Sequence, residues 1–83
     1  MNTVEIKKVY RHFKGKYYYV EGIATDSETL ENIVVYRHLG DSKLWTRSET
    51  MFLENIDSKR DDNITKQTVR FKLVNEINND RGE

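Results

Sequence analysis

The chain has no cysteine, no proline and no excess of charge of either sign. Without cysteine it has no disulfide scaffold, no thiolate metal site and no cysteine nucleophile. Without proline, the edges of any β-sheet must be protected by charged side chains or by closure of the sheet. The formal net charge of zero argues against a dedicated duplex-DNA binder, whose affinity rests on a basic face that releases counterions.

Long hydrophobic runs are also missing. The longest apolar runs fall far below the ~20 residues that span a bilayer. The first residues contain no apolar run of the kind that a secretory signal needs. We therefore expect a soluble, cytoplasmic protein that does not associate with membranes.

The size and composition predict one small domain with an aromatic core. A chain of 83 residues buries only about 60% of the surface that it exposes when unfolded. Because 36% of the residues are hydrophobic and 34% are charged, aromatic rings must supply much of the buried area. We expect a single domain over residues 1–74 and a polar tail over 75–83 that frays.

Charges are segregated along the neutral chain. Residues 7–16 carry five cations and no acid, whereas residues 21–31 carry four acids and no base. This pattern is compatible with a local basic face. It is equally compatible with two solvated hairpin ends that attract each other.

The apolar pattern is mostly that of strands. Gly15 predicts a tight turn and Gly22 a bulge or bend, while Ser48 can cap a helical turn over 48–53. Residues 57–63 read as a solvated loop. The predicted strands begin at Val4 and extend to Tyr10, then cover residues 17–24, 33–37, 44–47 and 68–73.

Several short strands with tight turns predict a mainly β fold. We expect a small SH3-like (or OB-like) barrel of about five short strands with one helical turn, because closure removes open edges in a domain of this size. Both strand orders fit the pattern.

Four spaced motifs carry a family resemblance. They are YRHFKG at residues 10–15, VVYR at 34–37, LWTR at 44–47 and MF at 51–52. In this combination the chain resembles the bacterial domain of unknown function 1653 family. It departs from the family pattern at Ser48 and Val69, where proline is usual. The resemblance implies a compact β-rich fold in a bacterial or phage setting, and it implies no established activity.

Aromatic and cationic residues mark a candidate site. Rings beside cationic donors can stack a flat ligand and hold its charge, and Arg47 supplies planar donors for phosphate or carboxylate. Trp45 and Arg47 are two residues apart on a predicted strand, so they share a face. The candidate ligand-binding residues are Tyr10, Arg11, His12, Lys14, Glu28, Tyr36, Trp45 and Arg47.

Each candidate also has a purely structural interpretation. Tyr36 and Trp45 could be core residues, as a lone tryptophan in a small barrel often is. His12 could be a structural or exposed residue beside a turn, and Lys14 a solvated turn residue. Glu28 could belong to the chemistry of a hairpin tip.

Three functional hypotheses follow. The first is a small module that binds a nucleotide, single-stranded nucleic acid or an anionic peptide, without a cofactor. The second is a small hydrolase or transferase in which His12 works with Glu28. The third is a protein-interaction adaptor that uses an exposed sheet edge. The spacing of His12, His38 and Glu28 suggests no metal site, and the oligomeric state stays open.

Overall fold

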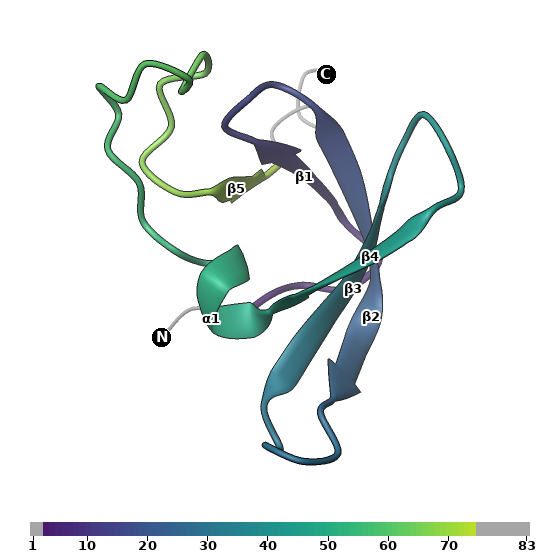
Figure 1. The fold of residues 1–83 in the computed structure, drawn as a ribbon. Helices are drawn as coiled ribbons and strands as arrows, with labels where there is room; N and C mark the ends of the chain where they lie inside the picture. The colour runs from purple at the N-terminus through teal and green to yellow at the C-terminus, as the bar shows by residue number, and fades with distance from the viewer. Residues whose placement is uncertain (1–2, 75–83) are drawn as a thin grey trace.

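One antiparallel sheet of five strands dominates the computed structural model, which describes residues 3–74 (Figure 1). The tail predicted over 75–83 lies outside the described residues. The strand order is β4-β3-β2-β1-β5. The elements are β1 (Val9–His12), β2 (Tyr17–Thr25), β3 (Asn32–His38), β4 (Leu44–Ser48), α1 (Glu49–Phe52) and β5 (Phe71–Leu73).

The sheet curls but does not close. Figure 1 shows β5 and β1 bending over a concave face, with α1 lying beside it. β4 and β5 form opposite edges of the sheet, because the chain leaves β4 through α1 and a long loop before it returns beside β1. The mainly β class, the five strands and the helical turn are confirmed. The closed SH3-like or OB-like barrel is not formed by the described residues.

Local sequence signals set the turns and the helix. Gly15 adopts a φ of +105°, which glycine tolerates without steric cost, and its N–H donates to the His12 carbonyl at 2.8 Å. The ladder between β2 and β3 shifts register between Val20 and Gly22, so the predicted bulge is present. Ser48 caps α1, because its Oγ accepts the Met51 N–H at 3.2 Å.

The first and last strands are shorter than predicted. β1 begins only at Val9, after a turn in which Lys7 has a φ of 60°. β5 begins only at Phe71. Val69 forms instead an isolated bridge to Asn55, and the neighbouring Arg70 N–H donates to the Glu54 carbonyl at 2.8 Å. The segment before β5 therefore pairs with the loop that follows α1.

The core is built from aromatic rings, as the composition predicted. Phe52 of α1 and Phe71 of β5 stack with centroids 4.1 Å apart and an interplanar angle of 3°. The rings of Tyr10 and Tyr36 pack edge-on against Phe52, with centroid distances of 5.2 and 5.4 Å. Val20 and Val34 are completely buried in the same cluster.

The loop between α1 and β5 is held by two buried amides. Asn63 is 1% exposed, and its Nδ2 donates to the Asp57 and Gln67 carbonyls while its Oδ1 accepts the Gln67 N–H. The Gln67 Nε2 in turn donates to the carbonyls of Arg11 in β1 and of Val69. Residues 57–63 are therefore not simply a solvated loop, because their last residue anchors the segment to the sheet.

Asn63→Ala is expected to destabilise the protein by about 2 kcal/mol or more, because it orphans buried backbone groups that cost roughly 1–3 kcal/mol each. For a domain of this size the melting temperature should fall by about 10 °C. Thermal unfolding measures the loss. The matched control is Asn55→Ala, whose exposed side chain lies in the same loop and whose replacement should cost under about 0.5 kcal/mol. Equal losses in the two variants would contradict the anchoring role.

Candidate ligand-binding face

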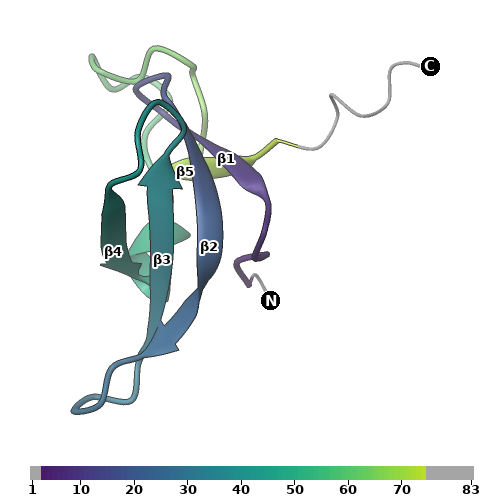
Figure 2. The same cartoon turned by 90° about the vertical axis from the view of Figure 1, so that its right-hand side faces the viewer.

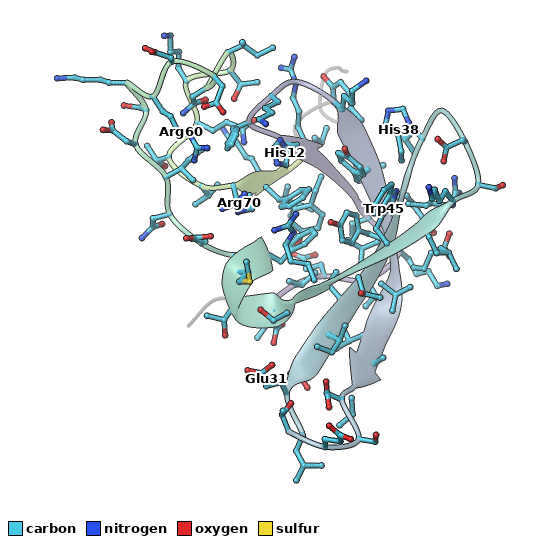
Figure 3. All side chains as sticks on the ribbon, viewed as in Figure 1. His12, Glu31, His38, Trp45, Arg60 and Arg70 are labelled. Carbon is cyan, nitrogen blue, oxygen red and sulfur yellow. The ribbon has the colours of Figure 1, made fainter. Side chains whose placement is uncertain are left out.

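The register of the strands gathers most of the candidate residues on the concave face. His12 lies opposite Phe71, Tyr36 opposite Trp45, and Val34 opposite Arg47. Directly opposed residues in an antiparallel pair point to the same side of the sheet, and the buried Val34, Tyr36 and Phe71 identify that side as the inner one. Figure 3 shows His12 and Trp45 at two margins of this face. We call the surface formed by His12, Tyr18, Tyr36, His38, Trp45 and Arg47 the concave face.

His12 is packed among rings and surrounded by cations. Its centroid lies 4.4 Å from that of Phe13 and 4.9 Å from that of Phe71. Burial, followed by the charges of Arg70, Lys14 and Arg47, lowers the pKa of His12 from 6.5 to about 4. The imidazole is therefore neutral at physiological pH.

The hydrogen bond that His12 accepts determines its tautomer. Nδ1 accepts the Lys14 N–H at 3.1 Å, so in the neutral ring the proton is assigned to Nε2. His12 thus presents an uncharged N–H donor and cannot serve as a proton acceptor at that atom. Such a group can donate to a carbonyl or an anionic oxygen on a ligand.

Arg47 differs from most of the other arginines by its lack of a carboxylate partner. Within residues 3–74, Arg37, Arg60 and Arg70 each form an ion pair with an acidic side chain. Arg47 instead donates from Nε to the Tyr36 Oη at 3.3 Å. The hydroxyl orients the guanidinium without neutralising it, so its remaining donors can hold an anion.

Trp45 is a surface residue and not a core residue. Its side chain is 46% exposed although it points to the inner side of the sheet, because β4 is an edge strand. The Lys43 Nζ lies 4.9 Å from the centre of its ring. An aromatic ring that is open to solvent and lies beside a cation can stack a flat ligand.

Sequence reasoning overlooked three residues of this region. The centroid of the Tyr18 ring lies 5.5 Å from that of Tyr36 and 5.4 Å from that of His38. His38 follows Tyr36 by two positions in β3. Lys43 precedes Trp45 by two. The period of two that placed Arg47 beside Trp45 would have identified both His38 and Lys43.

Three predicted site residues lie elsewhere or have structural roles. Tyr10 is 4% exposed and its Oη accepts the Glu5 N–H at 2.9 Å, so it belongs to the core. Arg11 lies between two inward-facing residues of β1 and therefore points to the convex side. Lys14 occupies the turn after β1, where its Nζ lies 3.8 Å from the Asp62 carboxylate.

Glu28 is far from His12. It lies in the turn that joins β2 to β3, where its N–H donates to the Asp26 Oδ1 at 2.8 Å. Figure 2 shows this turn at one end of the sheet and the turn after β1 at the other. The 9 residues of β2 separate the two turns, a length of about 30 Å at ~3.3 Å per strand residue. A catalytic pair of His12 and Glu28 is not formed in this arrangement, and the hairpin-tip interpretation of Glu28 fits its contacts.

Two shallow hollows lie outside the concave face. One, of about 220 Å³, is lined by Arg11 and Lys72 among others, and the second, of about 250 Å³, by Tyr10 and Leu53 among others. Among residues 3–74, no cluster of three or more histidine or acidic side chains is arranged to hold a metal ion. The same residues include no helix that is long and apolar enough to cross a membrane.

Comparison with known proteins identifies the family. The model of the family described as protein of unknown function (DUF1653) matches residues 8–73. The chain belongs to this family. A crystal structure of a DUF1653 protein from Bordetella bronchiseptica is similar, with 32% sequence identity, a TM-score of 0.67, and coverage of 84% of this chain and 87% of that one. No curated protein matches. The resemblance seen in the sequence motifs is confirmed, and DUF1653 membership brings a fold and a bacterial relative but no activity.

Acid should destabilise the protein through His12. Because its pKa is about 4 when folded and 6.5 in the ordinary state, the unfolded chain binds more protons between these values, and stability falls as the pH drops from 6.5 to 4. In His12→Phe, which retains a ring, this part of the pH dependence should disappear. Urea unfolding at several pH values measures it, and NMR of the imidazole nitrogens gives the pKa directly. A His12 that titrates near 6.5 in the folded protein would contradict the buried, cation-surrounded setting.

Proposed function

We propose that the concave face binds single-stranded nucleic acid or its nucleotide units. The observation that carries the proposal is the row of alternate residues Lys43, Trp45 and Arg47, of which Trp45 and Arg47 belong to the edge strand β4 and Lys43 immediately precedes it. The row places a half-exposed ring between two cations, and neither Trp45 nor Arg47 is used to build the interior. Cationic grooves with stacking rings are the usual means of holding single strands without reading their sequence.

The spacing of the row suits a polynucleotide. Alternate residues of an extended chain lie about 7 Å apart, so Lys43, just before β4, and Arg47 are separated by about 13 Å. This separation exceeds that of two successive phosphates, so the two cations would meet phosphates that are not adjacent in the strand. A base could then stack on Trp45 while phosphates on either side of it, more than one nucleotide apart, meet Lys43 and Arg47.

Neutral donors beside the row favour a ligand with oxygen acceptors. The Nε2–H of His12 and the hydroxyl of Tyr18 lie on the same face as Arg47. Burial raises the pKa of Tyr18, which keeps its hydroxyl protonated and able to donate. One unpaired arginine, one lysine and one exposed ring predict modest affinity, in keeping with a chain of zero net charge.

Trp45→Ala should weaken binding of a short single-stranded oligonucleotide by roughly tenfold or more, since stacking on a ring contributes about 1–3 kcal/mol per base. NMR titration of the folded variant, or the fluorescence of a labelled oligonucleotide, measures the loss. Thr46→Ala is the matched control, because Thr46 is exposed on the same strand but faces the convex side, and it should bind as the wild type does. Unchanged affinity in Trp45→Ala would contradict the proposal. Preference for an acidic peptide over every oligonucleotide would also contradict it.

The affinity for a single strand should depend only weakly on salt concentration, and part of this dependence should come from Arg47. Two phosphate contacts predict a slope of about −1.4 in a plot of log affinity against log salt for a single strand, and one contact about −0.7. Arg47→Gln should therefore halve the slope as well as weaken binding. Lys59→Gln, which removes an exposed cation from the loop after α1, should leave the slope unchanged. A slope that both variants alter equally would indicate non-specific attraction.

A further inference from the structure

Two cations oppose each other on the convex side of the sheet. Arg11 of β1 pairs directly with Lys72 of β5 in the antiparallel ladder. Like charges in such positions repel and destabilise the pair. Within residues 3–74 neither side chain forms an ion pair with a carboxylate, whereas three other arginines do. The repulsion is therefore not offset by the described part of the chain.

A hollow lies beside this pair. It measures about 220 Å³, and its lining includes Arg11, Tyr17, Thr65, Gln67 and Lys72, with no acidic residue among those that the structure describes. Drug-sized ligands occupy sites of roughly 300–1,000 Å³. The hollow is thus better suited to a small polyatomic anion than to a complete nucleotide.

Arg11 is held in place for such a role. Its guanidinium carbon lies 5.1 Å from the centre of the Tyr17 ring, and Tyr17 is also its cross-strand partner. Its Nε donates to the Gly15 carbonyl at 3.2 Å. Stacking and this single bond fix the plane of the guanidinium while the two terminal nitrogens keep their donors for a ligand.

We propose that the Arg11–Lys72 hollow is a binding site for a phosphate group. A phosphate dianion would sit between the two cations, accept from the planar donors of Arg11 and remove the repulsion across the ladder. The site is separate from the concave face, because Arg11 and His12 are adjacent in β1 and point to opposite sides of the sheet. This proposal does not depend on the proposed function of the concave face.

The test measures thermal stability and amide NMR shifts of the full chain in inorganic phosphate, with sodium chloride at equal ionic strength as reference. Phosphate should raise the melting temperature and shift the amides of Arg11, Thr65 and Lys72 in a saturable way. Lys72→Gln should melt about 1–5 °C higher than the wild type without phosphate, because the repulsion is gone. The same variant should lose most of the phosphate response.

Two control variants separate this site from other effects. Lys59→Gln should respond to phosphate as the wild type does, and so should Trp45→Ala, which impairs only the concave face. Acetate should shift the same amides less, because it carries one charge. Absence of a saturable phosphate response in the wild type, a full response in Lys72→Gln, or tighter binding of acetate than of phosphate would each overturn the proposal.

Discussion

The stack of Phe52 on Phe71 is the contact on which the rest of the structure depends. The sheet is open between β4 and β5, so no ladder of hydrogen bonds joins its two edges. The helical turn after β4 carries one ring and β5 carries the other, and their parallel contact at 4.1 Å joins the two edges through side chains. Tyr36 and Tyr10 pack edge-on against the stack. Removing a buried phenylalanine typically costs about 3–5 kcal/mol, which is a large fraction of the stability of a domain this small.

A core made of aromatic rings also determines the chemistry at its margin. Tyrosine and histidine contribute apolar surface to the interior and still present a polar atom at its boundary. His12 contacts Phe71 while its Nε2 remains without a partner among the described residues, and Tyr36 is buried while its hydroxyl orients Arg47. Core and candidate ligand-binding face are therefore continuous. The same packing that excludes water lowers the pKa of His12, and it keeps a neutral donor beside an unneutralised arginine.

Local patterns in the sequence predicted the features that depend on near neighbours. Gly15 predicted the turn after β1, Gly22 predicted a bulge or bend in β2, and Ser48 predicted the cap of α1. The period of two placed Trp45 and Arg47 on one face. Features that depend on distant residues were missed. Asn63 lies in a polar stretch that is typical of a solvated loop. Its burial depends on Gln67, whose Nε2 donates to the Arg11 carbonyl in β1 and so holds the loop against the sheet. Closure of a barrel was expected because it protects edges, but the chain leaves β4 through α1 and returns beside β1, so β4 and β5 remain opposite edges of the sheet. Side chains alternate between the two faces of a strand, so Arg11 and His12 lie on opposite faces of the sheet. Because the two residues are adjacent in the sequence, they were assigned to one candidate site.

Net charge is a poor guide to what this protein can bind, because its charges are balanced globally and not locally. Three arginines are neutralised by carboxylates across the sheet or along the loop. Among residues 3–74, the other two arginines, Arg11 and Arg47, form no ion pair and lie on opposite sides of the sheet. Each is oriented by a tyrosine, because Tyr17 stacks on the first and the Tyr36 hydroxyl accepts from the second. An arginine whose plane is fixed but whose charge is not paired loses little rotamer entropy when an anion arrives. Desolvation and repulsion make such an arrangement costly when it is empty. The two anion sites that we propose would give a physical reason for the absence of ion pairs at these two side chains.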